Sequence, residues 1–235
     1  MEEIKKMKKI FSNENIRNIR LYVNHEIMNQ GGKDKKDVSK CRFIHTERVA
    51  LISYQILGMY IDEYKRTKGK YTKDSKISKS DFKQVKRIVK SKAEKSVIFM
   101  GIIHDLFKMT EEVKDSHGLL AAEWFTEYCK LNKYQMKGIL KDIRDAIKNH
   151  SSKGDMKNKN IFYKILCDAD IISKYSVENA YEKSIKLNMT MLESIKNSMN
   201  IIENKNGYKG HTPFFNHLRK INKNKVLNEL KEKKK

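Results

Sequence analysis

The chain has 235 residues, and its 51 Lys+Arg against 29 Asp+Glu give a formal net charge of +22. This length favours a single domain, and the hydrophobic residues, 39% of the total, suffice for a core without disulfides or a structural metal. The longest apolar run, residues 97–103, is far below the roughly 20 residues needed to cross a bilayer, and residues 1–11 lack the apolar core of a secretory signal. We therefore expect a soluble, cytoplasmic protein with no membrane partner.

The excess positive charge is mostly lysine, spread through linkers and tails together with many asparagines and isoleucines. We interpret it first as a solvated lysine surface. A basic surface also leaves nucleic acid open as a partner, and its field attracts any anionic substrate. The three cysteines are widely separated and form no C-x-x-C pair, so no disulfide framework or cysteine metal site is expected.

Apolar residues recur at spacings of three and four along most of the chain, which contains a single proline, and this pattern predicts an all-α protein. In chain order, the expected helices cover residues 44–60, 96–107, 117–128, 139–147 and 161–177. A lysine-rich insertion at residues 64–93 is expected to be exposed, part loop and part amphipathic helix around Phe82, Val85 and Val89. A basic tail at residues 222–235 is expected to hold one short helix that frays at its end.

Several histidines and aspartates stand where the helical pattern calls for apolar side chains. They are His45, His104, Asp105, His117, His150, Asp168 and Asp170. A buried carboxylate is costly unless it is paired or bound to a metal, and imidazoles together with carboxylates suit Mn, Fe, Co, Ni or Zn. Almost every residue of this set belongs to a different helix, so only the fold could bring them together at a metal site in a helical core.

Periodicity does not decide between the two late aspartates. Asp168 lies on the same helical face as Ile165 and Ile172, whereas Asp170 shares a face with Tyr163 and Leu166. Both faces carry apolar residues, so either carboxylate could point into the core.

Three segments in this order resemble the HD-domain superfamily of metal-dependent phosphohydrolases. They are His-Thr-Glu-Arg-Val from His45, Gly-Ile-Ile-His-Asp-Leu-Phe-Lys at 101–108, and Ile-Leu-Cys-Asp-Ala-Asp at 165–170. The resemblance covers about residues 41–180. It implies an all-α, single-domain HD-type helical bundle spanning residues 1–235, with a metal in its core between His45, His104, Asp105 and a late aspartate.

The resemblance also implies roles within that set. The family usually uses the second acid of such a late pair, which indicates Asp170 as the ligand and makes Asp168 a supporting residue or an alternative ligand. Members with two metal ions carry further histidines like His117 and His150, with Asp105 bridging the ions. The alternative is a single-metal site in which His117 and His150 bind or protonate the substrate.

The activity implied by the resemblance is hydrolysis of a phosphoester or phosphoanhydride bond in a nucleotide or related phosphate ester by metal-activated water. One or two divalent ions would lower the pKa of bound water from 15.7 toward roughly 7, and Mg is a further candidate for the ion. Asp105 and Lys108 are the expected catalytic residues, and Lys108, Lys174 and Arg48 are the expected phosphate contacts. Ordinary surface charge is the alternative for both lysines.

Two positions depart from members of the family that cleave nucleoside triphosphates, because Ile171 and Ser173 replace a basic and an acidic residue. This leaves phosphodiesterase, dinucleoside polyphosphate hydrolase and nucleotidase activities open. Two other functions compete with them. One is a non-catalytic HD module that senses a nucleotide, and the other is a metal-dependent nuclease specific for single strands, which would use the insertion and the tail to follow the backbone. The oligomeric state is not indicated.

Overall fold

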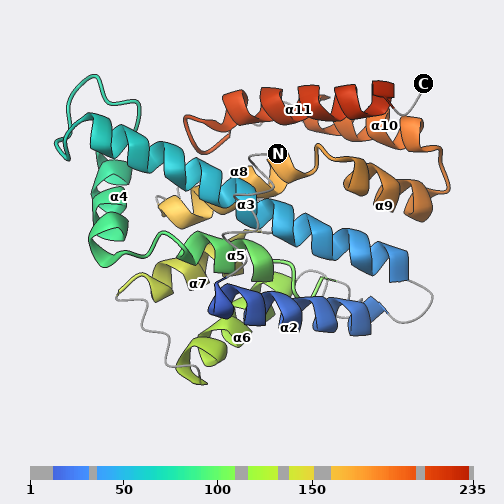
Figure 1. The fold of residues 1–235 in the computed structure, drawn as a ribbon, viewed down its shortest axis with the longest axis horizontal. Coiled ribbons are helices and arrows are strands. Elements are labelled where there is room, and N and C mark those ends of the chain that lie inside the picture. The colour runs from blue at the N-terminus through green and yellow to red at the C-terminus, as the bar shows by residue number, and fades with distance from the viewer. Residues whose placement is uncertain are drawn as a thin grey trace.

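The computed structural model describes residues 13–31, 36–108, 116–131, 138–150, 160–204 and 210–232. Within these ranges every regular element is an α-helix, in agreement with the predicted fold class (Figure 1). The helices are α2 (Glu14–Gly31), α3 (Lys36–Arg66), α4 (Lys79–Ser91), α5 (Ser96–Ile103), α6 (His117–Leu131), α7 (Leu140–Asn149), α8 (Ile161–Ser173), α9 (Val177–Leu187), α10 (Met191–Asn204) and α11 (Phe215–Glu232).

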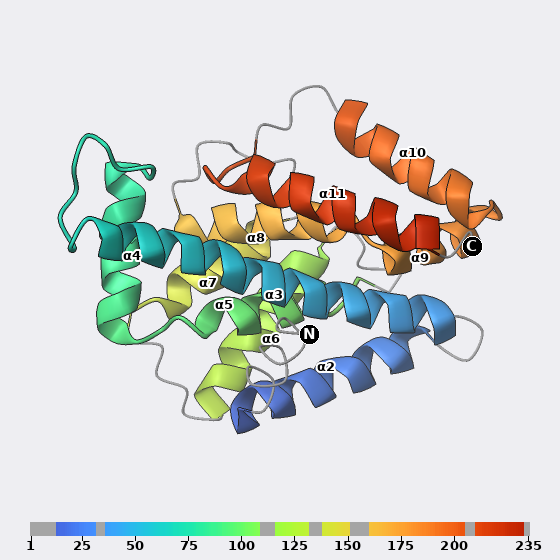
Figure 2. The same cartoon turned by 45° about the horizontal axis from the view of Figure 1, so that its top comes forward.

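The long helix α3 is the centre of the arrangement and packs against α2, α4, α5, α8 and α9. Figure 2 shows α2 on one side of α3 and α8 with α11 on the other. The stripe predicted within residues 44–60 is confirmed, since Val49, Ile52, Ile56 and Tyr60 are all buried. The helix is longer at both ends than this stripe indicated, so it contacts elements from nearly the whole chain.

Helix α5 lies against α3, and all eight of its residues are buried, as its uniformly apolar sequence predicts. Gly101 makes this close approach feasible. A Cβ at this position would lie 2.5 Å from the backbone nitrogen of Ala50 and in hard contact with its Cα. The two helices therefore pack backbone to backbone at the point where α5 delivers His104 and Asp105.

The insertion at residues 64–93 is less exposed than the sequence indicated. Helix α4 places Phe82, Val85 and Ile88 in the hydrophobic core that runs from Ile16 to Leu218. Burial of this apolar face explains the difference, because only the opposite, lysine-rich face of α4 remains in solvent. A hydrogen-bonded ion pair between Lys164 Nζ and Asp81 Oδ1, 2.7 Å long, further ties α4 to α8.

The C-terminal half differs from the predicted boundaries in two places. The helix expected at residues 161–177 ends at Ser173, and Ser176 caps a separate helix α9 by accepting a hydrogen bond from the Asn179 amide at 3.0 Å. The basic tail helix begins at Phe215 rather than near residue 222, while the fraying expected at its last residues falls outside the described part of the chain. In the described ranges, none of the helices combines the length and the apolar character that crossing a bilayer requires.

Candidate metal centre

The structure brings the histidines and acids of the motif together where several helices end. His45 comes from the first third of α3, and Asp170 from the last turn of α8. His104 and Asp105 directly follow α5, His150 directly follows α7, and His117 opens α6. Helices α5, α7 and α8 thus end at this centre, and the partial negative charge of a helix C-terminus favours a cation.

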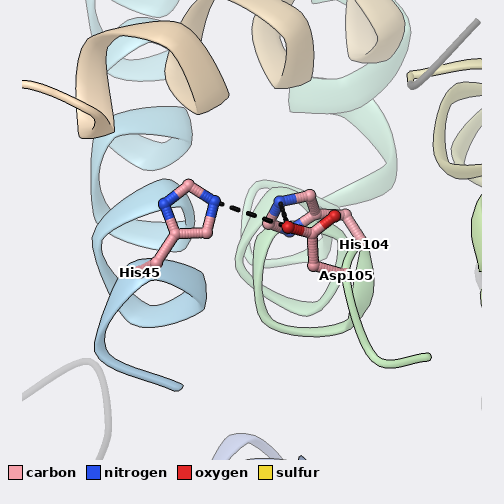
Figure 3. A group of neighbouring side chains, drawn as sticks. All are labelled: His45, His104 and Asp105. Atoms are coloured by element: carbon pink, nitrogen blue, oxygen red, sulfur yellow. Dashed lines mark ion pairs between the residues drawn. The ribbon is translucent and has the colours of Figure 1, made fainter. Parts of the chain in front are cut away.

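One group of ligand atoms gathers around His45, His104 and Asp170. The Asp170 Oδ1 atom lies 3.1 Å from His45 Nε2 and 3.9 Å from His104 Nε2. Both imidazole nitrogens also lie 3.6 Å from Asp105 Oδ2 (Figure 3). Donor atoms around an ion with bonds of about 2.1 Å lie about 3.0–3.4 Å apart, so the 3.1 Å contact has the spacing of a metal site and the other three contacts are 0.2–0.5 Å wider than this range.

A second group forms on the other oxygen of the same aspartate. Asp105 Oδ1 lies 3.3 Å from His117 Nε2 and 3.3 Å from His150 Nε2, and these two nitrogens are 3.3 Å from each other. The three atoms form an equilateral triangle of the size that one small ion needs. Asp105 therefore presents one oxygen to each group, in the position of a bridge.

Hydrogen bonds at the opposite ring nitrogen fix how two of these imidazoles are protonated. His104 Nδ1 lies 2.7 Å from the Gly101 carbonyl, and His150 Nδ1 lies 2.6 Å from the Ile147 carbonyl. A carbonyl only accepts, so each Nδ1 carries the proton and, in the neutral ring, each Nε2 carries a lone pair. These bonds also satisfy carbonyls that the last turns of α5 and α7 leave without a partner.

His45 is oriented by Ser173, a residue that the sequence did not indicate as part of the site. The Ser173 hydroxyl donates to the Asp170 carbonyl at 2.7 Å, which leaves its oxygen to accept from His45 Nδ1 at 3.0 Å. This relay sets the same tautomer as in His104 and His150. All three rings therefore direct a lone pair at the carboxylates, as metal-binding histidines do.

The buried atoms at this centre fit a cation. His45 Nε2, His104 Nε2 and Asp170 Oδ1 are buried and have no hydrogen-bond partner within the described residues. Burial lowers the pKa of His45, and it lowers that of His104 to about 3, so a proton does not bridge these lone pairs near neutral pH. Lone pairs that face one another in the interior repel unless an electrophile lies between them, and a divalent ion meets that need.

Three cations lie beside the two carboxylates. Lys108 Nζ is 2.8 Å from Asp105 Oδ2, Lys174 Nζ is 2.8 Å from Asp170 Oδ2, and Arg42 Nη1 is 3.2 Å from Asp105 Oδ2. Burial alone would raise the pKa of both aspartates, but the neighbouring lysine and imidazole groups outweigh it and hold both pKa values well below the ordinary range. Both acids are therefore ionised and ready to bind a cation.

The structure places Asp168 away from the role that the sequence suggested for it. Its carboxylate accepts hydrogen bonds from the backbone amides of His211 at 2.8 Å and Thr212 at 2.7 Å. Asp168 thus anchors the turn that leads into α11. Since Asp168 and Asp170 are two residues apart on one helix, their side chains point about 160° apart, and it is Asp170 that reaches His45.

Arg48 also differs from its expected role as a phosphate contact. Its guanidinium donates to the Tyr175 carbonyl at 3.1 Å and lies 3.8 Å from a Glu178 carboxylate oxygen. Tyr175 belongs to the connection between α8 and α9, and Glu178 belongs to the first turn of α9, so Arg48 holds this connection and the start of α9 in place. Arg42, six residues nearer the start of α3, supplies the arginine that faces the ligand acids.

Gly118 allows α6 and α7 to meet at the second group. A Cβ on Gly118 would lie 2.8 Å from the Ile147 carbonyl oxygen and 3.3 Å from His150 Nδ1. Ile147 is the residue whose carbonyl orients His150. A side chain at Gly118 would therefore displace the contact that aims His150 at Asp105.

The family comparison agrees with this geometry. The model of the family described as HD domain matches residues 42–175, which is more than half of the chain. The chain belongs to the HD-domain family. HD domains bind divalent metals and are commonly metal-dependent hydrolases, and the matched segment contains every histidine and acid of the two groups. Searches among curated proteins and among solved structures found no match.

The site of this HD domain includes residues that sequence reasoning missed. Arg42 lies three residues before His45, a spacing that places both on one helix face and could have indicated it. Ser173 lies three residues after Asp170 and gives the same kind of signal. Glu182, described below, lies beyond the matched segment and carries no motif that would single it out.

Proposed function

We propose that this HD domain hydrolyses a phosphoester or phosphoanhydride bond of a nucleotide or a related phosphate ester. The observation that carries the proposal is the position of Asp105, whose two oxygens each complete a separate group of ligand atoms. Paired ions that share a carboxylate are a common arrangement for displacement at phosphorus.

The chain's own residues would divide the work as follows. His45, His104 and Asp170 would hold one ion, and His117 and His150 would hold a second. Asp105 would contribute one carboxylate oxygen to each ion. When bound, the ions polarise phosphate oxygens and lower the pKa of water at the site. The imidazole nitrogens favour Mn, Fe, Co, Ni or Zn, while Mg, which prefers oxygen ligands, fits this set less well.

The three cations of the site are placed to receive the phosphate. The side chains of Lys108 and Lys174 are 30% and 34% exposed, whereas those of Asp105 and Asp170 behind them are 0% and 16% exposed. A phosphate that enters from solvent therefore meets the ammonium groups before it reaches the carboxylates. Once the carboxylates bind metal, Lys108, Lys174 and Arg42 can turn their N–H groups to non-bridging oxygens, whose charge otherwise repels a nucleophile.

A nucleotide panel tests this proposal. Nucleoside mono-, di- and triphosphates, cyclic nucleotides and dinucleoside polyphosphates would each be assayed with each metal, with phosphate and pyrophosphate release as the readout. We expect turnover with at least one transition metal and none in Asp105→Asn, which keeps the shape of the side chain but lacks the charge. A metal-loaded protein that releases no product contradicts hydrolysis, and saturable nucleotide binding without product would instead identify a sensing module.

A nuclease is the second candidate, and the outer face of α4 favours it. Lys83, Lys86, Arg87 and Lys90 line one hollow there, with spacings that put them on one helix face. Arg87 of this hollow pairs with Asp142 on α7, and Asp142 lies eight residues, about 12 Å of helix, before His150. A strand bound on this face could therefore extend to the candidate metal centre.

Charge reversal on this face separates the two candidates. For a nuclease, replacing Lys83, Lys86 and Lys90 by Glu should weaken oligonucleotide binding and shorten fewer strands, because phosphate contacts contribute additively and in a salt-dependent way. Mononucleotide turnover by the same variant is the internal control. Equal oligonucleotide cleavage by native and reversed proteins at low salt would contradict the nuclease.

A further inference from the structure

Arg42 is held from two sides, and one of its partners lies outside the segment that matches the family. Arg42 Nη2 lies 2.6 Å from Glu182 Oε1, while Nη1 lies 3.2 Å from Asp105 Oδ2. Glu182 belongs to α9, which packs against α3 and begins two residues after the matched segment ends. The guanidinium therefore spans from the candidate bridging acid to a helix that the family match does not cover.

Glu182 is itself fixed. The residue is 4% exposed, and the same Oε1 atom that meets Arg42 accepts a hydrogen bond from Lys186 Nζ at 2.6 Å, one turn further along α9. A buried glutamate needs such partners, because an isolated buried charge is strongly disfavoured. Arg42 and Lys186 together keep Glu182 ionised and its carboxylate in one place.

The two acids that hold Arg42 differ in what metal binding would do to them. Asp105 belongs to both groups of ligand atoms, so bound ions would compete with Arg42 for its oxygens. Glu182 belongs to neither group and would keep its contact. Immobilising an arginine side chain costs rotamer entropy, so an arginine without this second partner would sample many positions away from the metals.

We propose that Glu182 is a positioning residue that keeps the Arg42 guanidinium beside the metal centre, where its remaining N–H groups meet a substrate phosphate. This inference rests on the proposed phosphohydrolase function. It adds that α9, beyond the segment matched by the family, completes the phosphate-binding side of the site. The competing explanation is that Glu182 only neutralises a buried arginine and has no effect on phosphate.

Binding of inorganic phosphate to the Mn²⁺-loaded full chain, measured by calorimetry, tests the inference without requiring turnover. Glu182→Ala should weaken phosphate binding roughly 10-fold or more, as expected for a lost charge-assisted hydrogen bond, while the manganese content stays unchanged. Glu182→Gln still accepts a hydrogen bond from Arg42 but lacks the charge, so its phosphate affinity should lie between that of the native chain and that of Glu182→Ala. This variant keeps the test available if the alanine variant is unstable. Glu178→Ala, one turn earlier on α9, is the matched control and should bind phosphate like the native chain.

A double-mutant comparison distinguishes positioning from simple neutralisation. If Glu182 acts through Arg42, then Glu182→Ala adds no further loss of phosphate affinity to Arg42→Ala. Native phosphate affinity in Glu182→Ala, or full additivity with Arg42→Ala, overturns the inference and leaves the proposed function standing. A Mn²⁺-loaded native protein that neither binds phosphate nor hydrolyses any nucleotide overturns both.

Discussion

At the scale of single residues, the chemistry of this centre depends on which ring nitrogen carries a proton. His104 and His150 each donate from Nδ1 to a carbonyl three residues earlier, and His45 donates to Ser173. In each histidine, the hydrogen bond from Nδ1 holds the ring in place and leaves Nε2 as an acceptor that faces the acids. A divalent cation could serve all of these acceptors at once.

Removal of the Ser173 hydroxyl tests this relay. Ser173→Ala should lower metal affinity about 10-fold, because outer hydrogen bonds to metal-binding histidines are typically worth that much, with little change in helicity. Metal affinity would be measured by competition with a chelating dye. Ser184→Ala is the matched control, since Ser184 makes the same kind of bond to the Tyr181 carbonyl, at 2.8 Å, on the exposed side of α9. Equal losses in the two variants would contradict the relay.

The buried histidines also predict how stability depends on pH in the metal-free protein. The pKa of His104 falls from 6.5 to about 3 on folding because of burial, and that of His45 is lowered for the same reason. Between pH 6.5 and about pH 3, His104 therefore binds a proton in the unfolded chain but not in the folded chain. The free energy of unfolding should therefore decrease as the pH is lowered from about 6.5, by up to about 1.4 kcal/mol per pH unit for each group.

Urea denaturation between pH 7 and pH 4 measures this dependence. The low pKa values of Asp105 and Asp170 add a further loss only as the pH falls through their ordinary value of 3.8 and below. His104→Gln, which is neutral throughout, should show a shallower slope than the native chain above pH 4. His217→Gln, on the exposed side of α11, is the control. Parallel slopes for His104→Gln and the native chain would show that His104 is not held neutral.

At the scale of helices, the site is built from helix ends whose positions depend on close packing. Apolar periodicity predicted the stripe on α3 and the buried character of α5, because one face or all faces of a helix must meet the core. It did not predict that the helix expected at residues 161–177 would break after Ser173. That break depends on the cap at Ser176 and on Arg48, which holds the Tyr175 carbonyl, and such contacts are not encoded in a hydrophobic pattern.

The contact between α3 and α5 gives a prediction at this scale. Gly101→Ala would drive a Cβ into the Ala50 backbone, and overpacking of this kind costs about 1–3 kcal/mol. We also expect weaker metal binding, because Gly101 supplies the carbonyl that orients His104. Gly58→Ala on α3 is the matched control. A Cβ there meets nothing within 4 Å, so the free energy of unfolding should rise by about 0.5–1 kcal/mol. Equal stability of the two variants, measured by denaturation, would contradict the packing.

At the scale of the whole molecule, the centre unites residues from α3 to α8 that are far apart in the chain. The order of the motifs identified His45, the His104–Asp105 pair and the late acids as one set, but spacing could not choose between Asp168 and Asp170. The family resemblance indicated Asp170 as the ligand; in the structure Asp170 meets His45, while Asp168 accepts from the turn before α11. Arg42 and Glu182 depend on the same long-range packing, which is why sequence patterns did not reveal their pairing.

The most direct test of this account is the metal content of four proteins after reconstitution with Mn²⁺ and removal of free ions. We expect two ions per native chain, a near-complete loss in Asp105→Asn because this residue serves both groups, and a partial loss in Asp170→Asn. Asp168→Asn, two residues away on the same helix, should keep the native content. Native metal content in Asp105→Asn, or a loss in Asp168→Asn as large as that in Asp170→Asn with folding intact, would contradict the metal centre described above.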